Sequence, residues 1–573
     1  MLVSKKNLYE IFIRVTILLA ATLFTWLLLQ SCTKKNDLKD AGISYGITGV
    51  DPSMAASGDT VSIFGAGFAS DTSRNVVTIN GATAHVVSAS SEILKVIVPA
   101  SGVGRGNVQV QTGSQTSTFT DQFTLATVIS GNQSTSATWT ADNLYLLRGD
   151  VHFTKGTALT IQAGVIILGE KSSNASLTFD DGAHASLNGT SSNPIVFTSD
   201  QAVQLRWNGD WKGITFAGTS ATPADHLTYT RIEYAGSHPS NQPGAALTIN
   251  RAIAQDSISY IQTAYSAGDG FRFGAADGSL QHLKYLIAAG CSGNDFSFVN
   301  SDKADAQFLF GFKDPNFADP LGADGLLVTT AGPVTISNMT LVGADGLARN
   351  CNASGTPSYG WTSIVNDCRN ANAGRGVHIG GIDPTTGNEL TGNLQLFNSV
   401  IAAPYLAGIS LDGPATWAAY ENGGTIIRHT SVTCLGIPAV NIVTPVLPVM
   451  GYVFSAENQS GPGSGFVSVA AATQYTSFTQ YNDSDLLLQM SVPGTLVTAT
   501  DNLGIKNMVL YANLSRPIVT PQSGSALYTD ASFSDPQLGG GSFDQSGTFR
   551  GAFGSNDWTV GWTNFAPQLT PYQ

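Results

Sequence analysis

The chain has 573 residues, a formal net charge of −13, only 12% charged residues and 62 glycines. A chain of this length is expected to form two or three domains. The acidic balance argues against nucleic-acid binding, which needs a basic surface, and it disfavours polyanionic ligands. Low charge and abundant glycine favour many short strands joined by tight turns over helices.

The first segment has a basic start, an apolar run from Val15 to Leu29 and a cysteine, Cys32. The apolar run is shorter than the roughly 20 residues that a membrane-spanning helix needs, and its flanks have the order of a signal peptide. The motif Leu29-Gln30-Ser31-Cys32 resembles a bacterial lipobox. This resemblance implies that residues 1–31 are a signal peptide and that Cys32 carries lipid. Simple secretion and a retained membrane anchor are the alternatives.

A polar, charged stretch follows, and we interpret residues 32–44 as the lipidated cysteine and a flexible tether. Thr33 after the cysteine favours the outer membrane over inner-membrane retention. Lys34 to Asp37 resemble the charged export tag of Bacteroidetes surface lipoproteins. These resemblances imply a protein anchored by lipid to the outer membrane and facing the cell exterior, with the periplasmic side as the alternative.

Residues 45–126 have an all-β pattern. Val61 to Phe64 alternate in polarity and stop at a glycine-rich turn, and a later strand runs into Asn80-Gly81, a hairpin signal. Strands at this spacing predict a small sandwich. The motifs Gly58-Asp59-Thr60-Val61-Ser62-Ile63 and Gly65-Ala66-Gly67-Phe68 resemble the IPT/TIG immunoglobulin-like family. That family implies a binding or spacer module without catalysis.

From Trp139 onward, strand-like pieces recur at starts 18, 18, 19, 18 and 15 residues apart. A regular period of strands predicts a solenoid, in which each coil buries its apolar face against the next. The pieces are Leu159-Thr160-Ile161, Leu177-Thr178-Phe179, Ile195-Val196-Phe197, Ile214-Thr215-Phe216, Ile232-Glu233-Tyr234 and Leu247-Thr248-Ile249.

Several motifs of this region resemble bacterial surface proteins with a right-handed parallel β-helix of the pectate-lyase-like fold. They include Gly156 to Ile161, Asn193 to Ser199 and Gly268 to Phe273. The predicted fold class is therefore all-β, with an immunoglobulin-like sandwich followed by a parallel β-helix over residues 139–567. Polysaccharide lyases and hydrolases occur on this fold, but a fold alone does not confer function.

No residue pattern predicts catalysis. The chain lacks a Gly-His-Gly loop and a suitably flanked aspartate pair, and His378 stands alone on a predicted strand, where a structural role is favoured. No cofactor is expected, except that Asp269 and Asp295, which each precede an aromatic strand, are candidates for binding calcium, because calcium prefers oxygen ligands. Corner or capping roles are favoured for both, because neither lies in a spaced calcium loop.

The tryptophans offer a binding alternative, because flat rings can stack on sugars while polar neighbours fix orientation. The candidates for ligand binding are Trp207, Trp211, Trp361 and Trp417. Trp558 and Trp562 are instead predicted to cap the open end of the solenoid.

Cys351 and Cys368 lie in one polar stretch and are the favoured disulfide pair outside the cytoplasm. Taken together, the sequence favours a cell-surface lipoprotein that acts as a binding or adhesion module. The expected partners are the membrane, through the lipid, and a glycan or another surface protein. The alternatives are a polysaccharide lyase or glycoside hydrolase, and a purely structural surface protein.

Overall fold

We describe a computed structural model of the chain, which forms two compact units, residues 1–125 and 126–573. The predictions for the signal peptide, Cys32 and the tether lie outside the described residues. The described part is residues 45–572 except 103, 220–224, 238–243, 253–257, 275–278, 302, 315–323, 344–374, 384–385, 403–406, 435–451, 458–486, 491–516, 518, 522, 530, 540 and 542.

The first unit is a sandwich of two antiparallel sheets, as predicted. One sheet has the order β1–β3–β6–β5, and the other has the order β5–β4–β7–β8. The elements are β1 (Gly46–Asp51), β2 (Met54–Ala56), β3 (Thr60–Ala66), η1 (Thr72–Arg74), β4 (Asn75–Ile79), β5 (Ala82–Ala89), β6 (Ile93–Ile97), β7 (Gly104–Thr112) and β8 (Gln115–Gln133).

Residues that alternate between buried and exposed positions along the strands build the core of this sandwich. On β3, Val61 and Ile63 are fully buried, while Phe64 points to the outside. The predicted hairpin is confirmed: Asn80 and Gly81 join β4 to β5 with φ angles of 48° and 79°. Two positive φ angles match the turn that suits the twist of a hairpin, which is why Asn-Gly is favoured there.

The second unit is a parallel β-helix. Its elements are β9 (Ala137–Trp139), β10 (Leu144–Phe153), β11 (Ala158–Gln162), β12 (Ile166–Gly169), β13 (Ser176–Phe179), β14 (His184–Asn188), β15 (Ile195–Ser199), β16 (Gly213–Phe216), β17 (His226–Glu233), β18 (Ala245–Ile249), β19 (Ile258–Ala264), β20 (Asp269–Phe273), β21 (Ser279–Ala289), β22 (Phe296–Val299), β23 (Lys303–Phe312), β24 (Leu326–Thr329), β25 (Val334–Val342), β26 (Arg375–Ile382), β27 (Glu389–Leu390), β28 (Leu394–Phe397), β29 (Val400–Ala402), β30 (Ala407–Asp412), α2 (Pro414–Glu421), β31 (Ile426–Arg428), β32 (Ser431–Cys434), β33 (Tyr452–Glu457) and β34 (Leu487–Met490).

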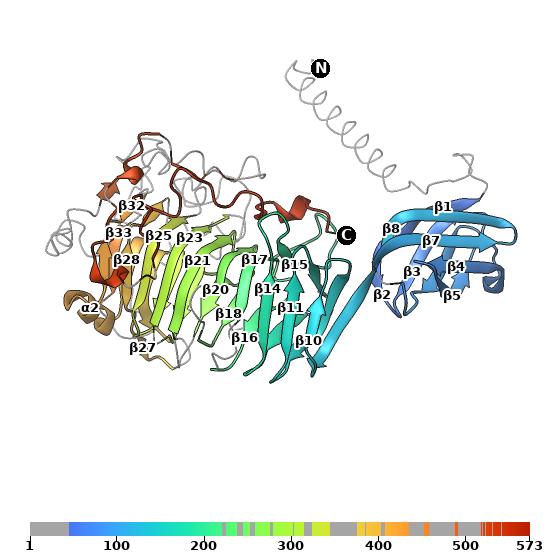
Figure 1. The fold of residues 1–573 in the computed structure, drawn as a ribbon, viewed down its shortest axis with the longest axis horizontal. Coiled ribbons are helices and arrows are strands. Elements are labelled where there is room, and N and C mark those ends of the chain that lie inside the picture. Colours follow the sequence, from blue (N-terminus) through green and yellow to red (C-terminus); the bar gives the residue numbers. More distant parts are fainter. Residues whose placement is uncertain are drawn as a thin grey trace, which may run out of the picture. The chain divides into compact units, whose positions relative to one another are not determined.

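Strands of successive coils pair in parallel along the length of the β-helix (Figure 1). One sheet runs β13–β16–β18–β20–β22–β24–β26–β30–β33. Leu177 pairs with Ile214, 37 residues later, and Leu247 with Phe271, 24 residues later. The predicted period near 18 residues is therefore the spacing between strands on different sides of a coil and does not measure one coil.

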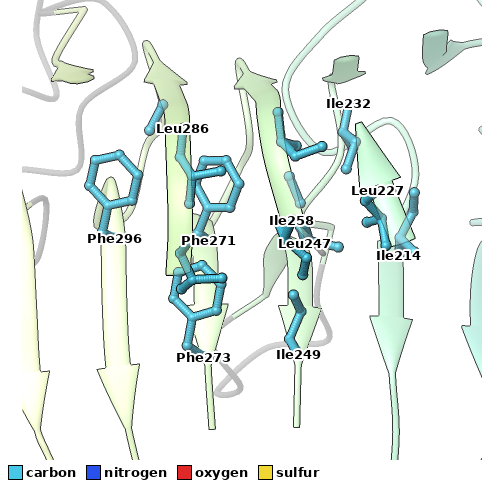
Figure 2. Packing of buried hydrophobic residues seen from close by; sticks show 14 of the residues in the cluster. Ile214, Leu227, Ile232, Leu247, Ile249, Ile258, Phe271, Phe273, Leu286 and Phe296 are labelled. Carbon is cyan, nitrogen blue, oxygen red and sulfur yellow. The ribbon is translucent and has the colours of Figure 1, made fainter. Parts of the chain in front are cut away.

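The interior is a continuous stack of apolar side chains. Ile214, Leu247, Phe271 and Phe296 occupy equivalent positions on successive coils and are buried (Figure 2). No coil could bury this face alone, so the stacking of neighbouring coils supplies the core.

Aromatic residues stack where long strands bend from one sheet into the next. Tyr229, Tyr260, Tyr285 and Phe308 all have positive φ, between 44° and 59°, and their rings stack at 4.4, 4.4 and 4.8 Å. A positive φ costs about 1 kcal/mol or more for a residue with a side chain. Ring stacking offsets part of that cost, by about 0.5–1.5 kcal/mol per pair.

The C-terminal segment, residues 517–572, forms a long irregular stretch that we call the strap. It contains only the short helices η2 (Ala526–Tyr528), η3 (Pro536–Leu538) and η4 (Pro567–Leu569) among its described residues. The strap, red in Figure 1, runs along one side of the β-helix from the late coils back toward β17 and β15.

Side-chain amides on successive coils bind the backbone of the strap. Gln262, Gln307, Asn338 and Asn398 donate to the carbonyls of Asn564, Asp544, Phe549 and Ser532, at 2.8 to 2.9 Å. An outward apolar row on the coils also packs against the strap, including Phe310 against Phe553, with ring centres 5.1 Å apart. The strap thus covers a sheet face that would otherwise expose a large apolar surface.

Trp558 and Trp562 belong to this lateral packing. Trp562 lies edge-on to Tyr260 at 6.0 Å, and Trp558 to Tyr285 at 5.2 Å. The prediction that these two residues cap the open end of the solenoid is wrong, because they cover the side of its aromatic stack. In the described part of the chain, no helix is both long enough and apolar enough to cross a membrane.

Candidate functional site

Three exposed apolar side chains lie on two segments that meet, the strap and the loop of residues 200–212 between β15 and β16. Leu205 and Trp207 of the loop are 67% and 59% exposed, and Leu569 of the strap is 55% exposed. The backbone N–H of Gln204 donates to the carbonyl of Gln568 at 3.2 Å, which joins the two segments. We call Leu205, Trp207 and Leu569 the Trp207 platform.

The buried carboxylate of Asp210 holds the loop in shape. Its Oδ2 accepts hydrogen bonds from the Ser199 hydroxyl at 2.6 Å and from the Trp207 backbone N–H at 2.9 Å. Its Oδ1 pairs with the Lys171 ammonium at 2.7 Å. Hydrogen bonds to a buried charge are stronger than neutral ones, so this carboxylate fixes the backbone beneath the exposed Trp207 ring.

Arg206 lies between the two exposed loop residues in sequence, but its side chain is buried. The guanidinium donates to the carbonyl of Gln201 in the loop at 3.0 Å. It also donates to the strap carbonyls of Pro567 and Thr570, at 3.2 and 2.7 Å, and lies over the Tyr572 ring, 4.9 Å from its centre. One side chain therefore connects the loop, which carries Trp207, to the strap, which carries Leu569.

Tyr572 forms the other half of this connection. Its hydroxyl donates to Oε1 of Glu233 at 2.7 Å and accepts from Arg231 at 3.1 Å and from the Asn564 side chain at 2.9 Å. Burial raises the pKa of the Glu233 carboxyl, although Arg231 and Tyr572 oppose the shift. Burial also raises the pKa of Tyr572, so its hydroxyl stays protonated and remains a donor.

Trp211 is placed differently from Trp207, four residues earlier. It is fully buried, its indole N–H donates to the Glu233 carbonyl at 2.9 Å, and its ring packs on Phe197 at 6.3 Å. A β-carbon at Gly169 would lie 2.5 Å from the Trp211 ring, so glycine makes room for it. Trp211 thus supports the loop from below and offers no face to a ligand.

The remaining tryptophans and cysteines of the predicted sites lie elsewhere. Trp361 and the predicted disulfide pair Cys351 and Cys368 lie outside the described residues, and Trp417 lies on α2 with a side chain outside the described set. Cys291 is a free, buried thiol. Burial raises the pKa of Cys291 to about 12, which makes the thiol unreactive near neutral pH.

A second polar cluster lies at the start of β26. The His378 ring contacts Asp324 through Nδ1 at 2.7 Å and Asp412 through Nε2 at 2.8 Å, and Arg375 reaches Asp412 at 3.2 Å. Burial and the Arg375 charge lower the pKa of His378, but the two carboxylates outweigh them and the pKa is raised. A protonated ring that donates from both nitrogens cannot accept a proton, and this geometry fits the structural role predicted for His378.

The two candidate calcium ligands are engaged by protein groups. Asp269 accepts from the Asn294 backbone N–H at 2.9 Å and from the Ser297 hydroxyl at 2.8 Å. Asp295 is fully buried beside Lys313, whose ammonium lies 3.0 Å from Oδ1. Burial raises the pKa of Asp295 to about 7, although the Lys313 charge lowers it.

The hydrogen bond between Asp269 and Asn294 is the first of a series that links successive coils. The Asn294 side chain accepts from the Asp324 backbone N–H at 3.0 Å, and Asp324 accepts in turn from the N–H of Arg375 at 2.6 Å. The corner role favoured by the sequence therefore describes Asp269 well. Within the described ranges, no group of three or more His, Cys, Asp or Glu side chains is arranged to hold a metal ion.

Sequence reasoning missed several residues around the platform. Nothing in the local sequence marks Arg206, Leu569 or Tyr572, because their roles depend on contacts across more than 330 residues of chain. The one usable signal is Leu205-Arg206-Trp207, in which a charged residue separates two large apolar residues in a segment predicted as a loop.

Comparison with known proteins agrees with the two-unit architecture. Residues 46–125 match the IPT/TIG domain, and residues 131–226 match the pectate-lyase like beta helix domain. No curated protein matches the chain.

Two solved auxiliary nutrient binding proteins, from Bacteroides thetaiotaomicron and Bacteroides ovatus, are each 24% identical over 14% and 15% of this chain, with TM-scores of 0.14 and 0.13. The chain spans about a fifth of the length of these two structures, 20% and 21%. Likeness of this extent does not address what the chain binds. The domain matches agree with the fold: residues 46–125 match the IPT/TIG domain, and the first coils of the β-helix, within residues 131–226, match the pectate-lyase like beta helix domain.

Proposed function

We propose that the protein is a lipid-anchored cell-surface binding protein and that its Trp207 platform binds a neutral glycan. The observation that carries the proposal is the exposure of Trp207 on a loop whose neighbouring side chains, Arg206 and Asp210, are buried and bonded. An exposed ring on a backbone that is held in place suits stacking on a sugar ring, because the loop loses little conformational freedom on binding.

The polarity of the surroundings supports an uncharged ligand. Gln204 is exposed beside the platform, so an accessible amide group lies next to the apolar residues. Amides can donate to and accept from sugar hydroxyls. The net charge of −13 disfavours polyanionic glycans such as polygalacturonate.

The catalytic alternative has less support. In the part of the chain that the structure describes, the best acid–base cluster is His378 with Asp324 and Asp412, and both ring nitrogens of His378 are already bonded to carboxylates. A lyase or hydrolase needs a group that can exchange a proton with substrate. The exposed Trp207 ring therefore supports binding more directly than the His378 cluster supports catalysis.

The test compares the soluble full chain from residue 33 with its Trp207→Ala variant. Each is mixed with insoluble cellulose, xylan, mannan, chitin and cross-linked polygalacturonate, and the retained fraction is measured. Truncating a central tryptophan typically costs about 2 kcal/mol or more, roughly a thirtyfold loss of affinity. We expect retention on a neutral polymer and its loss in the variant.

Phe64→Ala serves as the matched control, because Phe64 is an exposed aromatic residue on the sandwich. It should bind like the unmodified chain. Equal retention of the Trp207→Ala variant, or no retention of any protein, would contradict the proposal. New reducing ends or unsaturated products during the incubation would establish the catalytic alternative instead.

A further inference from the structure

We infer that the glycan site is composite and that Arg206 is a positioning residue which couples glycan binding to docking of the strap end, residues 564–572. The inference rests on the proposed function, because it concerns the same Trp207 platform. It goes further by making glycan binding depend on docking of the strap end, whereas the proposed function is carried by the exposure of Trp207 on the loop.

The geometry assigns this role to Arg206. Its backbone joins Leu205 to Trp207, while its guanidinium bonds to the strap carbonyls of Pro567 and Thr570. Leu569 lies between these two carbonyls in sequence and is exposed. The same hydrogen bonds that bury Arg206 therefore set the positions of both the loop and the strap portions of the platform.

Tyr572, at the end of the strap, also contacts the side chains that join the strap to the loop and the coils. Its ring lies beneath the guanidinium groups of Arg206 and Arg231, at 4.9 and 5.6 Å from the ring centre. Its hydroxyl reaches the buried Glu233 carboxylate. The end of the strap is thus held by charged partners, and also by the buried Phe565, whose ring lies 5.8 Å from that of Phe312.

Two buried polar atoms without partners make docking of the strap end less favourable. Nη2 of Arg206 and the hydroxyl of Tyr234 are buried without a hydrogen-bond partner among the described residues. Burying an unpaired polar atom is unfavourable, so closure of the strap end is less favourable than the hydrogen bonds of Arg206 and Tyr572 alone would make it. An equilibrium of this kind can be shifted by a ligand that contacts only the closed form.

Thermodynamic linkage makes the coupling measurable. If a glycan binds the closed platform, a saturating concentration must lower the equilibrium constant for opening of the strap end by the factor by which opening weakens glycan binding. A residue with a merely structural role would change stability without making backbone exchange at residues 564–572 depend on the ligand.

The experiment uses the soluble full chain and its Arg206→Lys, Tyr572→Phe and Trp207→Ala variants. Cellohexaose, xylohexaose and mannohexaose are titrated separately by calorimetry, and amide hydrogen exchange of residues 564–572 is measured with and without each oligosaccharide. Arg206→Lys keeps the charge but loses the planar guanidinium, whose Nε reaches the loop carbonyl of Gln201 while its Nη1 reaches the strap. We expect at least a tenfold loss of affinity and faster exchange at the strap end.

In the unmodified chain, a saturating oligosaccharide should slow exchange at residues 564–572 several-fold, and Tyr572→Phe should reduce affinity by a smaller factor than Arg206→Lys. Arg251→Lys is the matched control, because Arg251 is equally buried and pairs with Asp225 at 2.7 Å, away from the platform. It should leave both affinity and the ligand effect on exchange unchanged.

The outcomes separate the two proposals. If no oligosaccharide binds, or if Trp207→Ala binds normally, the proposed function fails and the composite site fails with it. If binding depends on Trp207 but Arg206→Lys binds equally well and the oligosaccharide leaves exchange at residues 564–572 unchanged, the composite site is overturned and the proposed function stands.

Discussion

At the scale of single residues, identical side chains have opposite roles according to what lies behind them. Trp207 is exposed, whereas Trp211 is fully buried four positions later. The sequence predicts both as ligand contacts, because it shows two tryptophans in a loop and no difference between them. The distinction depends on Phe197 and the Glu233 carbonyl, which belong to neighbouring strands and come close only when the coils stack.

His378 yields a prediction about pH. Its pKa is raised in the folded chain, so its stabilising contribution is complete below about pH 6.5 and is lost as the pH rises through the folded value. The pKa of Asp412 is lowered to about 2 and that of Asp324 is also lowered, so their contributions are lost as the pH falls toward those values. The cluster therefore stabilises the fold most between about pH 4 and pH 6.5.

We expect His378→Gln to lower the unfolding free energy by about 3 kcal/mol at pH 5.5, because removing one partner leaves buried charges uncompensated. The loss should be smaller at pH 8.5, where the histidine is less protonated. Urea unfolding of both proteins at the two pH values measures this, with the exposed His226→Gln as control. An equal loss at both pH values would show that the His378 charge is not involved.

At the scale of elements, the sequence predicts the strands well and the strap poorly. Alternating apolar residues and the glycines of the turns mark strands such as β11 and β16, because each strand has one face toward the core. The strap has no such period, since its residues fill spaces between side chains of the coils. For this reason the sequence does not reveal that Trp558 and Trp562 lie along the side of the solenoid instead of at its end.

Phe553 tests the role of the strap. It is buried between Phe310 and Trp558, with ring centres 5.1 and 5.2 Å away. Phe553→Ala should lower the unfolding free energy by about 3–5 kcal/mol and increase the binding of a hydrophobic dye to the exposed sheet face. Val560→Ala, at an exposed strap position, should change stability by less than about 0.5 kcal/mol. Equal effects of the two substitutions would show that the strap is not a cover for the core.

At the scale of the whole molecule, the lipid anchor remains a prediction from Cys32 and its neighbours. If Cys32 is lipidated, Cys32→Ala in the producing cells should move the protein from the membrane fraction to the soluble fraction, because anchoring by the acyl chains is lost. Membrane fractionation followed by immunoblotting measures the change, with Cys291→Ala as a control at a buried thiol. Unchanged fractionation of Cys32→Ala would refute the lipidation.

The sequence by itself determined the sandwich, the repeated strands of a solenoid and the Asn80–Gly81 hairpin, because alternation and turn residues act over a few residues. Only the tertiary structure decided which tryptophan is exposed and which residues surround it. Arg206 meets Thr570 across 364 residues of chain. Contacts of this kind depend on how the coils stack and where the strap returns, and no local pattern encodes them, because burial is a property of the packed molecule.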